Sequence, residues 1–156
     1  MLGPLDRVAV YAVDSAPHTI VAMTPVDDRK QLAKQVLGMR PGGGGIYVYQ
    51  ALLAAGQALL KTSAGTRHLV LFADASDAEE PGDYVNLLAD YRKAGITVSV
   101  IGMGSDTDCD AAFITDVAKR GGGRISFAAK PEDIPRLFAP FFKSVGFKVD
   151  HSGIIL

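Results

Sequence analysis

The sequence has few of the residues that build covalent or metal-bound frameworks. Its 156 residues include a single cysteine, Cys109, and no tryptophan. A lone thiol excludes both an intramolecular disulfide and a zinc site made of several cysteines. The fold must therefore depend on a packed core, and a chain of this length with 48% hydrophobic residues suffices for one ordinary globular domain.

The sequence also lacks an excess of charge and lacks long apolar runs. Sixteen basic and seventeen acidic residues give a net charge of -1, which provides no electrostatic attraction to nucleic acid or to an anionic membrane. No apolar run approaches the roughly 20 residues of a membrane span, and the segment after Met1 does not resemble a signal peptide. We therefore expect a soluble domain that contacts neither nucleic acid nor a membrane directly.

One stretch, residues 67–74, organises the predicted fold. Its centre, Leu69–Phe72, is apolar throughout and too short for a helix, which is typical of a strand buried on both faces of a parallel sheet. The stretch ends at Asp74, so a carboxylate lies at the carboxyl edge of the sheet. Ligands of open α/β sheets bind at this edge. Asp74 is therefore the first candidate site residue, with Ser76 and Asp77 close to it in sequence.

The remaining segments predict alternating strands and helices. We expect strands at 8–13 and 18–23, joined by a connection so short that they must form an antiparallel hairpin. The later expected elements are helices at 27–37 and 47–60, the strand at 69–73, a helix at 84–94, a strand at 96–101, a helix at 106–119, a strand at 124–127 and a helix at 131–142. This order predicts an α/β fold, a three-layer α/β/α sandwich whose sheet is mostly parallel with one antiparallel edge hairpin.

Two glycine-rich loops invite a nucleotide-binding interpretation. Pro41–Gly45 lacks the Gly-Lys-Ser/Thr ending of a phosphate loop. Gly102-Met103-Gly104 is half of a dinucleotide fingerprint, but no third glycine follows at the helix. We interpret both loops as turns and close-packing devices. The alternative that stays open is a small α/β hydrolase or nucleotide-binding domain that uses Asp74 and these loops.

The sequence offers no evident catalytic set. Cys109 lies between Asp108 and Asp110, whose charges would raise the thiol pKa and weaken it as a nucleophile. The histidines are His18, His68 and His151. Their spacing does not predict that any of them converges on a nucleophile, so we expect this protein not to be an enzyme.

Several segments, taken together, resemble the von Willebrand factor type A (vWA) domain. They are 6–10 with the hairpin after it, 41–47, 67–74, 94–104 and 121–124. The similarity extends over about residues 5–140 and is closest to bacterial membrane-anchored proteins that join such a domain to a glutamine-amidotransferase-like module. The resemblance implies a protein-interaction domain with another protein as its partner. It also implies that the parent protein is anchored in a membrane, although the sequence leaves the compartment unknown.

The resemblance further implies a metal-ion-dependent adhesion site at the carboxyl edge, of which this sequence has only part. The family's first strand, which ends in Asp-x-Ser-x-Ser, and the helix after it have no counterpart here. The metal-binding threonine of the second loop falls on Ile46 or at best Gly45, which have no side-chain oxygen. Asp74 matches the third element and is the one candidate metal ligand. We therefore expect Mg²⁺ to bind weakly or not at all, and we expect no other cofactor.

These inferences give a domain division and a candidate surface. We expect residues 1–142 to form a vWA-like domain without its first strand and helix, and 143–156 to form a tail with a candidate strand at 145–149. The expected binding surface consists of Gly43, Gly44, Gly45, Ile46, Tyr47, Asp74, Ser76 and Asp77.

The missing first strand predicts a gap in the sheet between strands 8–13 and 69–73. Unpaired backbone groups in a buried position cost roughly 1 to 3 kcal/mol each, so the gap must be refilled. The flanking strands could close on each other, the tail strand at 145–149 could insert from its own chain, or a second copy could supply a strand. We favour a homodimer, because strand exchange buries apolar surface without repacking the helices.

Overall fold

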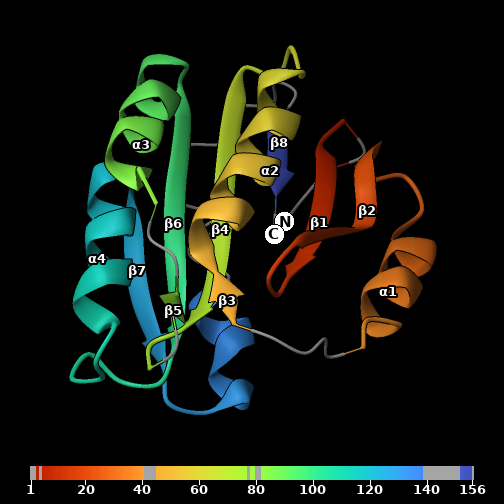
Figure 1. Cartoon of the computed structure of the whole chain (residues 1–156). Helices are drawn as coiled ribbons and strands as arrows, with labels where there is room; N and C mark the ends of the chain where they lie inside the picture. The colour runs from red at the N-terminus through yellow and green to blue at the C-terminus, as the bar shows by residue number, and fades with distance from the viewer. Residues whose placement is uncertain are drawn as a thin grey trace.

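A six-stranded sheet forms the centre of the protein (Figure 1). The computed structural model describes residues 3, 5–40, 45–76, 78–79, 82–138 and 152–155, the last four by their backbone alone. The strands of this sheet are β1 (Arg7–Val13), β2 (Pro17–Pro25), β4 (Thr66–Asp74), β6 (Ile96–Met103), β7 (Gly122–Ala128) and β8 (Ser152–Ile155). Their order is β2-β1-β8-β4-β6-β7, with β2 antiparallel to β1 and every other neighbouring pair parallel. The predicted sheet and its edge hairpin are confirmed.

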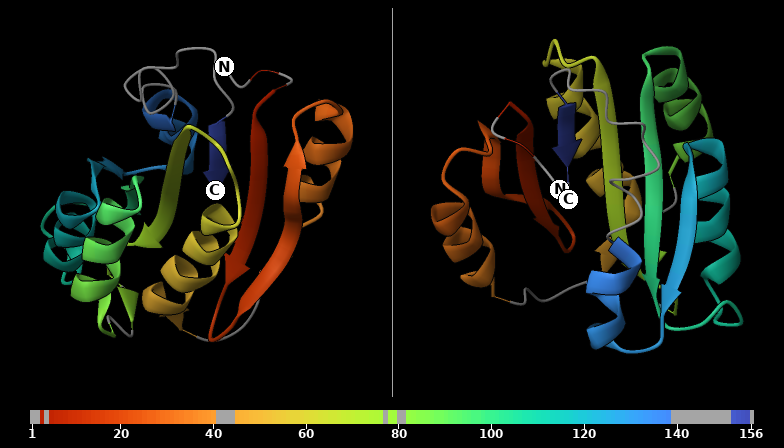
Figure 2. Two further views of the ribbon diagram at one scale, coloured as in Figure 1. Left: turned by 90° about the horizontal axis from the view of Figure 1, so that it is seen from above. Right: turned by 180° about the vertical axis from the view of Figure 1, so that it is seen from behind.

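Helices cover both faces of this sheet, which confirms the three-layer sandwich. The helices are α1 (Arg29–Leu37), α2 (Val48–Leu60), α3 (Tyr84–Lys93) and α4 (Ala111–Arg120), and a 3₁₀ turn (Pro131–Asp133) continues as a helix through residue 138. α2, α3 and α4 pack on one face, and the segment 131–138 lies on the opposite face (Figure 2). α1 packs against the hairpin through Leu32 and Val36.

The main core lies between the sheet and helices α2, α3 and α4. Its fully buried members include Leu52 and Leu59 from α2, Leu88 from α3, and Val98 from β6. Deep in this layer the hydroxyl of Tyr91 donates a hydrogen bond to the backbone oxygen of Leu52, over 2.8 Å. The small residues of α2 let this helix lie close to the sheet, as the sequence predicted.

Of the predicted boundaries that differ from the structure, two differ for identifiable reasons. α4 begins at Ala111 rather than 106, because the Asp108 carboxylate accepts hydrogen bonds from the backbone N–H and the hydroxyl of Ser105 and holds a turn there. β7 begins at Gly122 rather than 124. A Cβ at Gly123 would collide with the backbone of Val98, so glycine allows the strand to start early against β6.

β8 occupies the predicted gap between β1 and β4. Its backbone pairs in parallel with Arg7–Ala9 on one side and with Thr66–Leu69 on the other. The gap is thus filled from the same chain, by residues 152–155, whereas the strand predicted at 145–149 falls outside the described residues. β8 reaches only as far as Ala9 and Leu69, so the position is filled along part of its length.

His68 is a buried polar residue of β4. It lies in the first half of this strand, where β8 pairs with β4. Its side chain is 3% exposed, and Nδ1 lies 2.6 Å from the hydroxyl oxygen of Thr97 on β6. Nε2 is buried without a hydrogen-bond partner in the described structure. Burial disfavours the charged imidazole and lowers the pKa of His68 from 6.5 to about 4.

This buried histidine predicts acid sensitivity of the fold. The unfolded chain takes up a proton at His68 near pH 6.5, whereas the folded protein stays neutral there until about pH 4. The unfolded state therefore binds more protons in this window, and stability falls as the pH decreases from about 7 towards 4. A fall in the pKa of His68 from 6.5 to about 4 corresponds to a loss of up to about 3 kcal/mol of stability. Urea unfolding of the wild type and of His68→Gln across this window should give a flatter pH dependence for the variant, and equal slopes would contradict the assignment.

Candidate functional site

A small two-stranded sheet brings the two predicted loops together at the carboxyl edge. β3 (Ile46–Tyr47) pairs in parallel with β5 (Ala78–Glu79), which follows shortly after Asp74 at the end of β4 (Figure 1). The predicted surface residues Gly45, Ile46, Tyr47, Asp74 and Ser76 are thereby gathered at one edge of the protein. Three others, Gly43, Gly44 and Asp77, lie outside the described residues.

The Asp74 carboxylate closes a turn with Ser76. Its Oδ1 accepts one hydrogen bond from the backbone N–H of Ser76, over 2.9 Å, and another from the Ser76 hydroxyl, over 2.8 Å. This arrangement is an Asx turn, a local structure that aspartate forms without any ligand. Asp74 thus has a structural role in ending β4 and turning the chain.

Ile46 and Gly45 occupy the place where the second metal loop would supply an oxygen. The Ile46 side chain packs against the main core and lines an apolar cavity between β1, α2 and β4. Gly45 contributes no side chain, and a Cβ there would collide with the Glu79 carboxylate. The position is therefore apolar on one side and already approached by an acidic group on the other.

The loop after β6 also belongs to this edge, which the sequence did not predict. The backbone N–H of Asp110 donates to the carbonyl oxygen of Ala75 over 2.8 Å, and Oδ2 of Asp110 accepts from the N–H of Ala78 over 3.2 Å. Asp110 thus ties the turn after β4 to the start of α4. The only local signal is the Gly102-Met103-Gly104 loop, which marks a strand end but does not reveal this tertiary partner.

Cys109 lies at the same edge and is not an activated nucleophile. Its thiol donates to the carbonyl oxygen of Ser76 over 3.3 Å and lies 3.5 Å from Oδ2 of Asp110. Desolvation, followed by the hydrogen bond to Asp110, raises the pKa of the Cys109 thiol. His68, a candidate base, is buried on β4 beside Thr97 and towards the opposite edge. Cys109 and His68 are therefore not paired, and His151 lies outside the described residues.

The donor set that the described residues of this edge provide does not fit a divalent metal. Mg²⁺ requires near-octahedral oxygen coordination, usually from one or two carboxylates with hydroxyls and waters. In the part of the chain that is described, no three histidine, cysteine or acidic side chains are grouped so that they could hold a metal ion. The Ser76 hydroxyl already donates a hydrogen bond to the Asp74 carboxylate, and the Ile46 side chain packs against the core.

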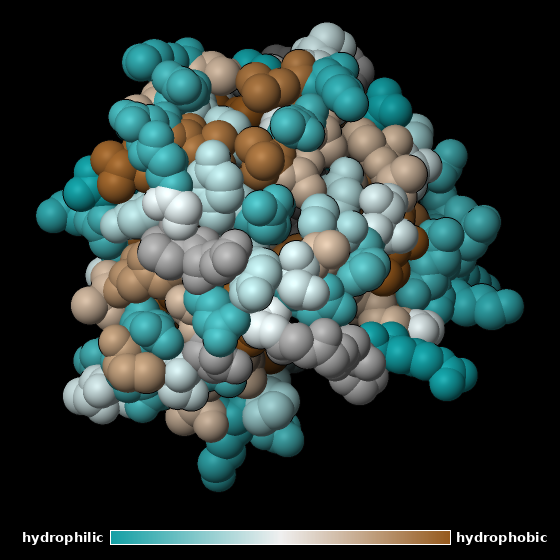
Figure 3. All heavy atoms as spheres, viewed as in Figure 1, coloured by the Kyte–Doolittle hydropathy of each residue, from teal (hydrophilic) through white to brown (hydrophobic). Residues whose placement is uncertain are grey.

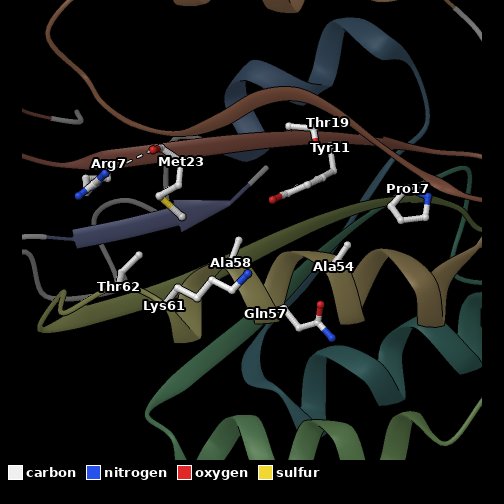
Figure 4. Close-up of a pocket in the computed structure, with 10 residues that line it drawn as sticks. All are labelled: Arg7, Tyr11, Pro17, Thr19, Met23, Ala54, Gln57, Ala58, Lys61 and Thr62. Carbon is white, nitrogen blue, oxygen red and sulfur yellow. Dashed lines mark hydrogen bonds between the residues drawn. The ribbon is translucent and has the colours of Figure 1, made fainter.

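A groove lies elsewhere on the surface, between the hairpin and α2 (Figure 4). It measures about 480 Å³ and is lined by Arg7, Tyr11, Pro17, Thr19, Met23, Ala54, Gln57, Ala58, Lys61 and Thr62. The lining includes two cationic side chains and no carboxylate. The Arg7 guanidinium donates to the backbone oxygen of Met23 over 3.4 Å. Sequence analysis missed this groove, because it depends on the packing of a helix across a hairpin.

The visible face of the molecule offers no single large apolar patch. Apolar side chains come to the surface there in small groups among polar ones (Figure 3). Among the described helices, none is both long and apolar enough to cross a membrane.

Comparison with known proteins identifies a family match and several solved structures with a similar fold. The sequence profile of the von Willebrand factor type A domain matches residues 3–139. A conserved hypothetical protein, BatB of Bacteroides thetaiotaomicron, superposes with a TM-score of 0.76 at 15% identity, covering 92% of this chain and 80% of that one. A von Willebrand factor type A protein of Catenulispora acidiphila gives 0.78 at 20% identity, covering 95% of this chain and 36% of that one.

A third similar structure is an aerotolerance-related membrane protein of Bacteroides fragilis, with a TM-score of 0.71 at 17% identity. The alignment covers 88% of this chain and 79% of that protein. At such identities the solved structures show a shared fold and no more. A search of curated proteins finds no match.

The geometry at the edge predicts little or no affinity for divalent ions. Calorimetric titration of the protein with Mg²⁺ and with Mn²⁺ should release no saturable heat at low micromolar concentration, because too few oxygens replace the hydration shell. Asp74→Ala should leave the titration unchanged. Tight binding that disappears in Asp74→Ala would contradict this prediction and would require ligands from outside the described residues.

Proposed function

The chain belongs to the von Willebrand factor type A domain family, and from this premise we propose that it is a non-catalytic protein-interaction domain with an incomplete metal-ion-dependent adhesion site. Domains of this family are typically interaction modules. The observation that carries the proposal is Ile46, which packs against the core where the family's metal loop needs an oxygen. The expected partner is another protein.

The proposed contact surface is the carboxyl edge formed by the β3–β5 pair and the turn at Asp74. Ser76 and Glu79 are exposed there, and the half-buried Tyr47 lies beside them. Backbone hydrogen bonds fix this edge, since the N–H of Tyr47 donates to the Asp14 carbonyl over 3.2 Å. A rigid edge of this kind supports binding through hydrogen bonds and side-chain packing, with no metal bridge to a partner carboxylate.

We also propose that the domain is carried by a membrane-anchored parent protein. The support is the similarity to a structure described as an aerotolerance-related membrane protein. The described part of this chain would then be the portion that meets the partner, and the anchor would belong to the remainder of the parent.

Site-specific photo-crosslinking in cells tests the proposed surface. A benzophenone amino acid at Ser76 or at Glu79 should give discrete adducts of higher mass, because both side chains are exposed at the edge. The same probe at Lys93, which ends α3 at the opposite edge of the sheet, is the matched control. Gln57 in the groove is a second control.

Three results would contradict the proposal. Adducts of equal yield at Lys93, or adducts confined to Gln57, would place the partner elsewhere. Saturable turnover in a panel of nucleotides and esters, abolished by Asp74→Ala, would favour the hydrolase or nucleotide-binding alternative.

We further propose that the domain forms a homodimer by exchanging β8. The support is the topology: β8 is a four-residue strand that pairs with β1 and β4 through its backbone. A β8 strand from a second copy would make the same pairs, so exchange changes few contacts.

Light scattering coupled to size exclusion tests the dimer. The wild type should show twice the 16.4 kDa of one chain. Gly153→Pro removes an N–H from β8, where Gly153 pairs with both Arg7 and Arg67, and should shift the population towards monomer. A wild type that stays monomeric at all accessible concentrations would rule out the exchange.

A further inference from the structure

The groove between the hairpin and α2 has a different character from the carboxyl edge (Figure 4). Its volume of about 480 Å³ falls in the range that small organic ligands occupy. Tyr11, Met23 and Ala58 are half-buried members of its lining and pack against the main core. A ligand that covered these three side chains would release water from apolar surface.

Several polar side chains of the groove have unused hydrogen-bonding groups. The side chains of Tyr11, Gln57 and Lys61 form no hydrogen bond or ion pair with any described residue. The Arg7 guanidinium donates one long hydrogen bond, of 3.4 Å, to the backbone oxygen of Met23 and has further N–H groups. Figure 4 shows the Tyr11 hydroxyl and the Lys61 side chain directed towards the space between β1 and α2. These groups can therefore bind a ligand without giving up contacts to the described residues.

The described lining carries charge of one sign. Arg7 begins β1 and Lys61 follows the end of α2, so the two cationic side chains belong to the same end of the groove. None of the described residues that line the groove is acidic. The carboxylate closest in sequence, that of Asp6, accepts a hydrogen bond from the N–H of Gly3 over 2.6 Å. The groove therefore favours an anion, although the net charge of the whole chain is -1.

The position of Lys61 limits the charge of that anion. Lys61 is the C-cap residue of α2, and the C-terminal end of a helix carries a partial negative charge. This charge opposes a doubly charged phosphate more strongly than a singly charged carboxylate. The planar guanidinium of Arg7 also matches a carboxylate in geometry. The groove therefore suits a carboxylate attached to an apolar body.

We propose that this groove is a binding site for a small organic carboxylate. The charged group of the ligand meets Arg7 and Lys61, and its apolar body covers Tyr11, Met23 and Ala58. The site is separate from the carboxyl edge and goes beyond the proposed protein-interaction function. Neither proposal depends on the other.

An NMR titration of the isotope-labelled full chain with phenylbutyrate tests the site. We expect saturable shifts of the backbone amides of Thr19, Gln57, Ala58 and Lys61, while those of α3 stay in place. The dissociation constant should be about 1 mM, the strength expected of so small a ligand. Phenylbutanol has the same body without the charge and should bind at least about fivefold more weakly. Phenylpropyl phosphate should bind no more tightly than the carboxylate.

Protein variants locate the site. Lys61→Gln removes one cation of the groove and should weaken binding of phenylbutyrate about threefold. Lys119→Gln removes the same charge from the last turn of α4 and should leave binding unchanged. Ala54→Leu places a larger side chain in the groove and should abolish binding. Ala89→Leu, at an exposed position of α3, is the control for this change.

The series of ligands makes the proposal testable on the wild type alone. It would be overturned by equal binding of the carboxylate and the alcohol, by the absence of saturable shifts in the groove, or by undiminished binding to a folded Ala54→Leu. Tighter binding of the phosphate would overturn the assignment to a carboxylate. Protein adducts at Gln57 in the crosslinking experiment would overturn the proposal as well, because a protein would then occupy the groove. Binding of phenylbutyrate without adducts at Ser76 and Glu79 would leave this site standing and would overturn the proposed edge surface.

Discussion

The backbone pairing of β8 is the constraint on which the rest of the structure depends. The hairpin β1–β2 and the sheet β4–β6–β7 have no strand contact of their own in the described structure, and β8 pairs with both. The other connection is α2, which packs across both parts with Leu52 and Leu59 against the sheet. Four residues of strand therefore join two halves of a sheet whose remaining strands run for seven residues or more.

At the carboxyl edge, hydrogen bonds perform the organising role that a bound ion performs in a metal site. The carbonyl oxygen of Ala75 and the N–H of Ala78 are both held by Asp110, and the Asp14 carbonyl holds the start of α2 through Tyr47. Loops from β1, β4 and β6 are thus fixed relative to one another by groups already present. This explains how the edge can be ordered although Ile46 offers no ligand.

Much of the fold could be predicted because its signals are local. The apolar run Leu69–Phe72 indicates a buried strand, and the short connection between β1 and β2 indicates a hairpin. β8 could not be predicted in its place, because Ser152–Ile155 is short and nothing local marks it as central. Alternation made 145–149 the better strand candidate. The short strands β3 and β5 also lack a pattern, since two residues are too few for a period.

The candidate site was also only partly predictable from the sequence, and again the predictable residues are those with a local signal. Asp74 was found because a carboxylate after a buried strand is visible in sequence. Ile46, or at best Gly45, was placed by the resemblance to the family's second metal loop. Asp110 was missed because its partners, Ala75 and Ala78, are more than thirty residues away in sequence and meet it only when β4 and β6 pair. Sequence patterns report burial and turns, whereas such hydrogen bonds depend on register.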